Sequence, residues 1–232
     1  FLFATATYYA KWAYCTDLTT GAVDTAKLGT FTMVSSLLMF FPLIIGTLVG
    51  SPIMKAIGSP IRFHRILILL EFVPGGILFV LQMVGLLQSL PAVYLLCMGV
   101  CACAIGMDYI PGEVINIEAM DYEIYKNGKD RSALCNAANK FLGKAQSAVA
   151  SGLVGVILVA VGYEVDSATD TFLGELSSIP VMLDWFIVIM GLIPFFLGLV
   201  GWLVLKRYPI TDETRADMHE KLSGTSHAAG NT

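Results

Sequence analysis

The sequence predicts an all-α membrane protein with six transmembrane helices. Of its 232 residues, 56% are hydrophobic and only 14% are charged, whereas soluble domains carry about 25% charged residues. The apolar residues form runs that reach the length of about 20 residues that a helix needs to cross a bilayer. The mean hydropathy of +0.73 agrees with this pattern. We therefore expect lipid to be the solvent for most of the chain.

Six apolar runs, separated by polar or helix-breaking segments, are the expected spans: 1–16, 30–57, 66–88, 91–117, 133–163 and 180–205. Lys and Arg gather in every second connection and after the last run, as Lys55, Arg62 and Arg65, then Lys126, Lys129 and Arg131, then Lys206, Arg207, Arg215 and Lys221. Cytoplasmic loops carry such an excess, so the alternation predicts a cytoplasmic C-terminus.

Two regions follow from this layout. Residues 1–205 are expected to form a bundle of six helices, and 206–232 a cytoplasmic tail. Because the chain starts with Phe1 inside an apolar run, we expect its first helix to be truncated. Within the tail, Thr211 to Leu222 is typical of a short amphipathic helix with Thr211 as its N-cap and Gly224 near its end. Residues 223–232 are expected to be disordered.

Several function classes lack their sequence signature. There is no glycine-rich phosphate loop, serine-nucleophile signature or zinc pattern, and the five cysteines lack metal-ligand spacing, so we interpret them as packing residues. The basic residues follow the membrane topology instead of forming a patch for nucleic acid. A membrane enzyme would need a catalytic cluster near one interface, and none is visible. We therefore expect neither an enzyme nor a nucleic-acid-binding protein, and no cofactor.

The fifth run carries a polar stripe. Its members recur at helical spacing and share one face: Asn136, Lys140, Gly143, Lys144, Ser147 and Ser151. Charged residues inside a membrane usually face a bundle interior or a watery cavity and mark the path of a solute. Lys144, one turn deeper than Lys140, fits that role best. The alternative is that both lysines snorkel to the headgroups, and it is strongest for Lys140.

The fourth run has a second polar face. Tyr109, Gly112, Glu113 and Asn116 lie at i, i+3, i+4 and i+7, with Asp108 beside them. The adjacent proline should loosen the helix and free backbone groups for a ligand. An aromatic ring can stack on a sugar, and carboxylates can accept hydrogen bonds from its hydroxyls. The alternative is a helix that leaves the membrane early, with Glu113 and Asn116 in water.

Other polar residues have a local explanation. Glu71 could snorkel toward Arg65, but it could also pair with a neighbouring helix or bind a proton. His64 is expected in the connection before the third run. An aromatic belt at the membrane surface explains the cluster near the end of the first run, where Tyr8 or Tyr9 could instead line a solute path: Tyr8, Tyr9, Lys11, Trp12 and Tyr14.

A dense block of charge and tyrosine separates the fourth and fifth runs. It resembles the signature of the glycoside–pentoside–hexuronide:cation symporters, the melibiose-permease branch of the major facilitator superfamily. Members carry an acidic-Tyr-x-Glu-aromatic-Lys motif, then Gly and a basic residue, at the cytoplasmic turn between helices ten and eleven. The matching residues are Asp121-Tyr122-Glu123-Ile124-Tyr125-Lys126, then Gly128 and Arg131. Further matches are Lys144-Ala145-Gln146-Ser147-Ala148, Gly162-Tyr163 and Tyr208-Pro209-Ile210-Thr211.

The resemblance implies the C-terminal half of a twelve-helix transporter in the plasma (cytoplasmic) membrane. Such a transporter has two six-helix halves with the substrate between them near the midplane. It would take up a sugar or glycoside with Na⁺ or H⁺ by alternating access, in contact with membrane lipid and with an N-terminal half that this sequence lacks. The family's cation-binding carboxylates lie mainly in that first half.

The resemblance also implies roles for individual residues. Those expected at the substrate are Tyr109, Asn139, Lys140 and Lys144, with Asp108 and Glu113 adding charge nearby. Those expected to gate the cytoplasmic side by making and breaking charge pairs are Asp121, Tyr122, Glu123, Lys126 and Arg131.

The sequence departs from the family pattern at several positions. Lys140 stands where a small polar residue is usual. Glu123 replaces a small residue of the motif, and Ile124 stands at its second acid. These departures leave an anionic or amino-bearing solute open beside a neutral disaccharide. A carrier of the same superfamily for a lipid, a drug or another organic anion is the alternative function, although such a carrier should have a more apolar cavity.

Overall fold

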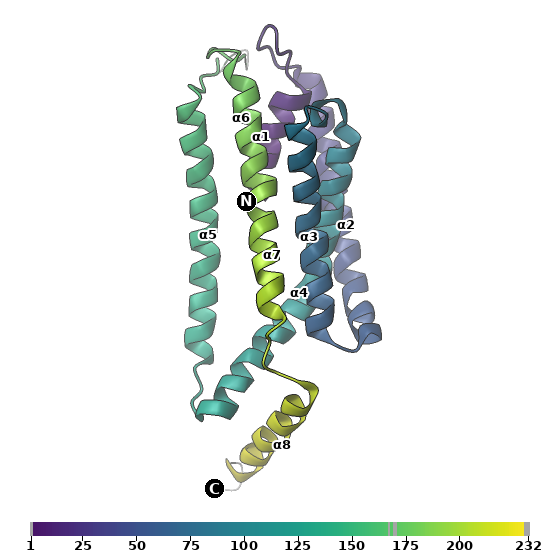
Figure 1. Cartoon of the computed structure of the whole chain (residues 1–232), viewed down its shortest axis with the longest axis vertical. Coiled ribbons are helices and arrows are strands. Elements are labelled where there is room, and N and C mark those ends of the chain that lie inside the picture. The colour runs from purple at the N-terminus through teal and green to yellow at the C-terminus, as the bar shows by residue number, and fades with distance from the viewer. Residues whose placement is uncertain (1, 167, 169–170, 230–232) are drawn as a thin grey trace.

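The computed structural model describes residues 2–166, 168 and 171–229, and this part of the chain is mainly helical (Figure 1). In chain order the elements are α1 (Leu2–Tyr14), α2 (Thr25–Ile57), α3 (Pro60–Met83), the 3-10 turn η1 (Leu87–Ser89), α4 (Pro91–Asn127), α5 (Ser132–Ala160), α6 (Ser178–Ile187), the π-helical segment η2 (Val188–Leu192), α7 (Ile193–Leu205) and α8 (Asp212–Ala229). We call the end of the bundle that carries α8 the tail end. The opposite end, with connections 15–24, 84–90 and 161–177, is the loop end.

Five stretches of the described chain are long and apolar enough to cross a membrane. They are α2, α3, α4, α5 and the continuous stretch from Ser178 to Leu205. The remaining expected span, 1–16, appears as α1, whose 13 residues extend about 20 Å at the helical rise. That length is short of the roughly 30 Å of a hydrocarbon core. The described residues therefore support five spans, and the expected sixth is not confirmed.

Capping residues, rather than hydrophobicity, set where two of the helices begin. The side chain of Asp24 accepts a hydrogen bond from the backbone N–H of Lys27, so α2 begins five residues earlier than expected. Ser59 does the same for Arg62, and a proline follows it. The prediction of a connecting loop at His64 is therefore wrong, because this residue lies in the first turns of α3.

α2 and α4 cross at a contact between glycines and main chain. A Cβ atom added to Gly46 would lie 2.2 Å from the backbone oxygen of Cys103, and one added to Gly106 would lie 2.1 Å from the backbone oxygen of Leu43. Small residues allow helix backbones to approach closely in membranes. Only glycine fits at these two positions, because the obstacle is main chain rather than a movable side chain.

The last span contains a π-helical segment between α6 and α7. The backbone N–H of Ile193 donates to the carbonyl of Val188, an i to i−5 bond. Gly191 in this segment packs against Gly75 of α3, since a Cβ on Gly191 would lie 2.4 Å from the Gly75 oxygen. Beyond it, α7 carries Trp202 toward the tail end.

α5 stands apart from most of the bundle (Figure 1). Its buried residues are Ala150, Val154 and Ile157, all in the half near the loop end. Residues 132–149, in the half near the tail end, include no buried side chain. The expected polar stripe lies largely in this uncovered half.

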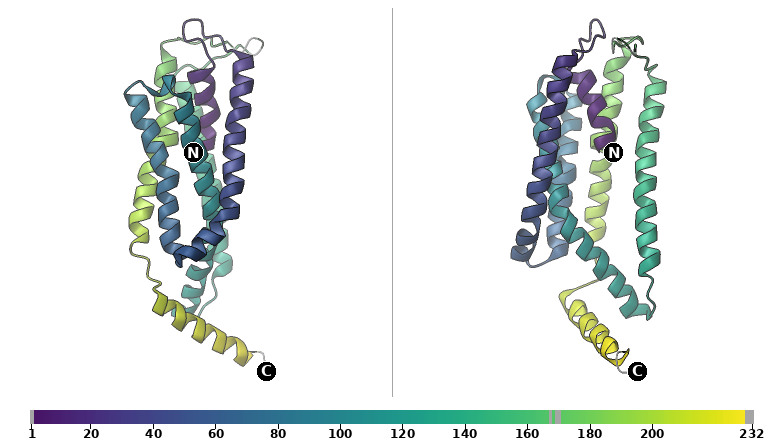
Figure 2. Two further views of the ribbon diagram at one scale, coloured as in Figure 1. Left: turned by 90° about the vertical axis from the view of Figure 1, so that its right-hand side faces the viewer. Right: turned by 180° about the vertical axis from the view of Figure 1, so that it is seen from behind.

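α8 follows the last span and packs against α4 at the tail end (Figure 2). The Thr211 hydroxyl accepts a hydrogen bond from the backbone N–H of Thr214, which confirms the expected N-cap. The helix continues past Gly224 to Ala229, so the prediction of disorder is wrong for 223–229, and 230–232 lie outside the described residues. A glycine inside a helix costs about 1 kcal/mol but does not have to end it.

The cysteines are free thiols, as a packing role predicts. Cys15, Cys97 and Cys101 are buried, and Cys103 and Cys135 are partly buried.

Candidate functional site

α4 continues well beyond the expected end of the fourth span and contains most of the charged block. It is one helix to Asn127, and Gly128 ends it with a φ of 63°, a left-handed conformation that favours glycine. The prediction of a turn is therefore wrong for 121–127. Glu, Lys and Tyr are tolerated in a solvated helix, so the helix has no reason to stop before the glycine.

The predicted gating residues make weak contacts within this block. Arg131 Nη1 lies 3.5 Å from Glu123 Oε1, and Lys126 Nζ lies 5.7 Å from the centre of the Tyr122 ring. Asp121 lines a groove between α4 and α8. Exposed ion pairs contribute about 0–1 kcal/mol, so these contacts can form and break at little cost.

Stronger contacts join the tail end of α4, from Glu118 to Tyr125, to α8. Nε and Nη2 of Arg215 donate to the two carboxylate oxygens of Glu118 at 2.8 and 3.2 Å. The hydroxyl of Tyr125 donates to Asp217 Oδ2 at 2.5 Å, and Lys221 Nζ donates to the same oxygen at 3.2 Å. A two-pronged bond between guanidinium and carboxylate is strong and directional. α8 is therefore held against the tail end of α4.

α4 and α5 touch near the tail end. Asn139 Nδ2 donates a long hydrogen bond to Asn116 Oδ1, over 3.5 Å. Asn116 belongs to the predicted face of α4 that carries Tyr109 and Glu113, and Asn139 precedes Lys140 on α5. Tyr109 is 55% exposed, and Glu113 is exposed as well. This contact places the predicted face of α4 beside α5.

The lysines of α5 lie in its uncovered half. Lys140 and Lys144 are both exposed and one turn apart. Leu142 on the other side of the helix is also exposed, at 62%. The described helices therefore cover neither face of α5 at this level, and its lysines are open to whatever lies beside it.

Asp108 does not share the face of Tyr109. Its Oδ1 atom lies 2.5 Å from Nδ1 of His64 in α3, so its side chain turns into the contact between α3 and α4. Pro111, three residues further on, is buried inside a helix that continues past it. The expected loosening at this proline does not interrupt α4, although Pro111 lacks the N–H for one internal hydrogen bond.

Comparison with family models identifies the chain over most of its length. The family described as MFS/sugar transport protein matches residues 1–212. The chain belongs to this family. Comparisons with curated proteins and with solved structures give no match. Together with the five apolar spans, membership makes the chain a multi-pass membrane transporter of the major facilitator superfamily.

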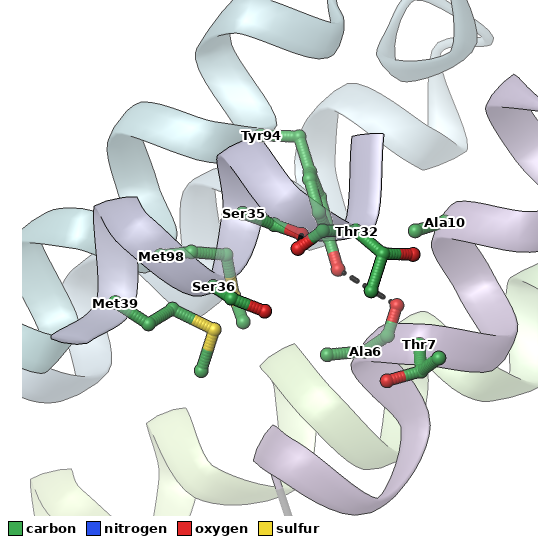
Figure 3. Close-up of a pocket in the computed structure, with 9 residues that line it drawn as sticks. All are labelled: Ala6, Thr7, Ala10, Thr32, Ser35, Ser36, Met39, Tyr94 and Met98. Atoms are coloured by element: carbon green, nitrogen blue, oxygen red, sulfur yellow. Dashed lines mark hydrogen bonds between the residues drawn. The ribbon is translucent and has the colours of Figure 1, made fainter. Parts of the chain in front are cut away.

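A small cavity lies between α1, α2 and α4 of this MFS chain (Figure 3). The hydrophobic pattern of the sequence did not indicate it. Its volume is about 70 Å³, which is room for ordered water. The lining residues are Ala6, Thr7, Ala10, Thr32, Ser35, Ser36, Met39, Tyr94 and Met98. Four of them follow helical spacing along α2, and that spacing was the available signal.

A polar chain inside the bundle was also missed. The Tyr9 hydroxyl donates to Gln82 Oε1 at 2.7 Å, and Gln82 Nε2 donates to Asp184 Oδ1 at 2.7 Å. These three residues link α1, α3 and α6. Tyr9 and Trp12 are 0% exposed, so the interpretation as an aromatic belt is wrong for them. Their rings pack against others of the loop end rather than against headgroups.

Acid should release part of the fastening between α8 and α4. The hydrogen bond from Tyr125, and then that from Lys221, lowers the pKa of Asp217. A lowered pKa in the folded state stabilises docking above the usual Asp value of about 3.9, and this contribution is lost as the pH falls through the lower folded value. We expect the amides of α8 to be protected at neutral pH and to lose protection below about pH 4 in hydrogen exchange corrected for intrinsic rates.

Asp217→Asn is the matched control for this pH dependence. It should reduce protection already at neutral pH and remove most of the acid-dependent change. If wild type and the variant lose protection along the same pH curve, Asp217 does not control the docking of α8.

Proposed function

We propose that the chain is the C-terminal half of a secondary transporter that moves a sugar or glycoside together with Na⁺ or H⁺ by alternating access. The observation that carries this proposal is the contact between Asn116 of α4 and Asn139 of α5, beside exposed lysines on a membrane helix. Lysine facing lipid is costly, so such a face normally borders water or protein. A second six-helix half facing it would enclose a polar path.

Within this path the residues have distinct roles. Tyr109 would stack on an apolar face of the sugar, and Glu113 would accept hydrogen bonds from its hydroxyls. Asn139, Lys140 and Lys144 would donate to the sugar from the opposite side. Asp108 is engaged by His64, so it would act on this face indirectly.

The charged block of α4 would be the gate at the tail end, which the distribution of Lys and Arg places in the cytoplasm of a plasma membrane. Arg131 and Glu123 form a weak pair, which suits a contact that breaks in each cycle. α8 would hold the inner end of α4 in position while the gate opens.

Neutralising the gate should impair transport more than binding. We expect Arg131→Gln or Asp121→Asn to slow sugar uptake by about tenfold while changing the sugar Kd by less than about threefold, because the charges act between states. Uptake into proteoliposomes and equilibrium binding in detergent measure the two quantities. An equal loss of uptake and affinity would contradict the gating role.

The function itself is tested by counterflow. The complete protein that carries this sequence is reconstituted into proteoliposomes preloaded with unlabelled glucose, xylose or melibiose. Entry of the same radiolabelled sugar from outside is compared with and without Na⁺ and across pH. Exchange of at least one sugar is expected, with accumulation in a Na⁺ or pH gradient. Absence of exchange for a broad panel of sugars would overturn the proposal.

One observation favours the alternative of a lipid or drug carrier. An apolar cavity of about 350 Å³ lies between α5 and the last span, lined by side chains that include Leu153, Val156 and Trp185. It could accept an acyl chain. Transport of a fluorescent phospholipid without exchange of any sugar would identify this second function.

A further inference from the structure

α3 and α4 place three titratable side chains at their interface. His64 Nδ1 and Asp108 Oδ1 are 2.5 Å apart, and the two side chains are 20% and 21% exposed. Further into the bundle, the thiol of Cys101 donates to the backbone oxygen of Glu71 at 3.1 Å. Glu71 itself is partly buried.

These contacts fix the antiparallel register of the two helices. Residue 64 lies opposite 108 and residue 71 lies opposite 101. Both pairs are seven residues apart within their own helix, which is two turns and therefore the same face. Glu71 thus lies about 10 Å beyond His64, toward the loop end, at the helical rise of 1.5 Å per residue.

Glu71 is a carboxyl group without a hydrogen-bonding partner in the part of the chain that the structure describes. Leu67 and Ile68, on the helix between it and His64, are buried. A carboxylate within a membrane span is costly when it is ionised and unpaired. The same group is far better tolerated as the neutral acid.

The chemistry of these groups sets what they can bind. A proton taken up by Glu71 forms a single O–H bond on a carboxyl oxygen without any co-reactant, and it removes the negative charge of that group. His64 and Asp108 lie two turns away on the same face of the interface, so a change of charge on either one acts on Glu71.

The other charges nearby have partners or lie further along their helices. They are Arg62 and Arg65 on α3, Lys55 on α2, Asp184 on α6, Lys206 after α7, and Glu113 and Glu118 on α4. Arg65 and Lys206 lie over the ring of Trp202, at 5.0 and 3.8 Å from its centre. Asp184 accepts from Gln82, and Glu118 is bound to Arg215. Among the described residues, none of these contacts involves the carboxylate of Glu71.

We propose that Glu71, His64 and Asp108 form a proton-binding site that couples solute transport to protons, with Glu71 as the group that takes up the proton and the His64–Asp108 pair as its connection to the tail end. This inference rests on the proposed transport function for its coupling role, but the binding of the proton can be tested without any sugar.

The first experiment is an infrared pH titration of the complete protein in proteoliposomes without sugar. A carbonyl-stretch band of a protonated carboxyl group should titrate in wild type and disappear in Glu71→Gln. Glu164→Gln, which removes an exposed acid between α5 and α6, should leave the band unchanged. His64→Gln and Asp108→Asn should each move the titration midpoint by about 0.5 pH units or more, because each removes a neighbouring charge.

The second experiment uses the sugar that exchanges in counterflow. In Glu71→Gln, accumulation driven by a pH gradient should fall at least about tenfold, while counterflow without a gradient stays within about twofold of wild type. Glu164→Gln should match wild type in both assays.

The outcomes separate the two proposals. If no sugar is exchanged but the infrared band behaves as described, the transport proposal fails and the proton site stands. If the band persists in Glu71→Gln, or if this variant still accumulates sugar with protons, the proton site is overturned. Should Glu71→Gln not fold, an unchanged midpoint in both His64→Gln and Asp108→Asn overturns it instead.

Discussion

Replacing Gly106 with valine is expected to leave little folded transporter in the membrane. A Cβ atom at this position of α4 would lie 2.1 Å from the backbone oxygen of Leu43 and 2.9 Å from its carbonyl carbon. No side-chain rotation can relieve this clash, so α2 and α4 would have to separate along their contact. Overpacking usually costs 1–3 kcal/mol, and we expect about 3 kcal/mol or more here. Thermal unfolding and the yield of monodisperse protein from membranes measure the loss.

Gly152→Val on α5 is the matched control. It introduces the same β-branched residue into a membrane helix, and nothing lies within 4 Å of its new Cβ atom. It should therefore show only the small effect of helix propensity. Equal losses at both positions would mean that propensity, rather than the close crossing of α2 and α4, controls folding.

Replacing Lys144 with glutamine should lower kcat/KM for sugar uptake by about tenfold or more without unfolding the protein. A hydrogen bond from a charged donor to a ligand is worth about 1.5–3 kcal/mol, which corresponds to roughly ten- to a hundredfold in rate. Lys144 is exposed, so its replacement should leave the bundle intact. Uptake kinetics and thermal unfolding measured on the same preparation test both parts.

Two neighbours on α5 provide the comparison. Leu142→Ala, on the other side of the helix, should retain nearly all uptake. Lys140→Gln, one turn closer to the tail end, should lose less than Lys144→Gln. If Lys144→Gln transports as well as wild type, the lysine anchors α5 at the headgroups and takes no part in the solute path.

Five of the six expected spans could be predicted from the sequence because they depend on a property of each segment alone, its hydrophobicity. Their ends depend on local chemistry that a hydropathy window averages out. Asp24 and Ser59 each accept a hydrogen bond from the backbone N–H three residues further on. These caps extend α2 and α3 into segments that looked like connections. Gly128 likewise sets the end of α4, after the helix has passed through a block that its charges suggested was a turn.

Periodicity assigns residues to the faces of α4 and α5 without reference to neighbouring helices. What periodicity leaves open is which face meets which helix. Glu118 and Arg215 are separated by 97 residues, and His64 and Asp108 by 44. Such pairs depend on the register between helices, which is set by close contacts such as those of Gly46 and Gly106 rather than by any local pattern.

The π-helical segment in the last span rotates the side chains of α7 about the helix axis relative to those of α6. One additional residue in a turn advances the phase of the helix by about 100°, so α6 and α7 present differently phased faces to α3. With this rotation, Trp202 of α7 faces Arg65 of α3. Asp184, in α6 before the segment, contacts Gln82 of α3. Deleting one residue from Val188–Leu192 would straighten the winding and carry the indole about a quarter-turn away from its cation. The last span is therefore two independently phased helices, each locked to a different part of α3.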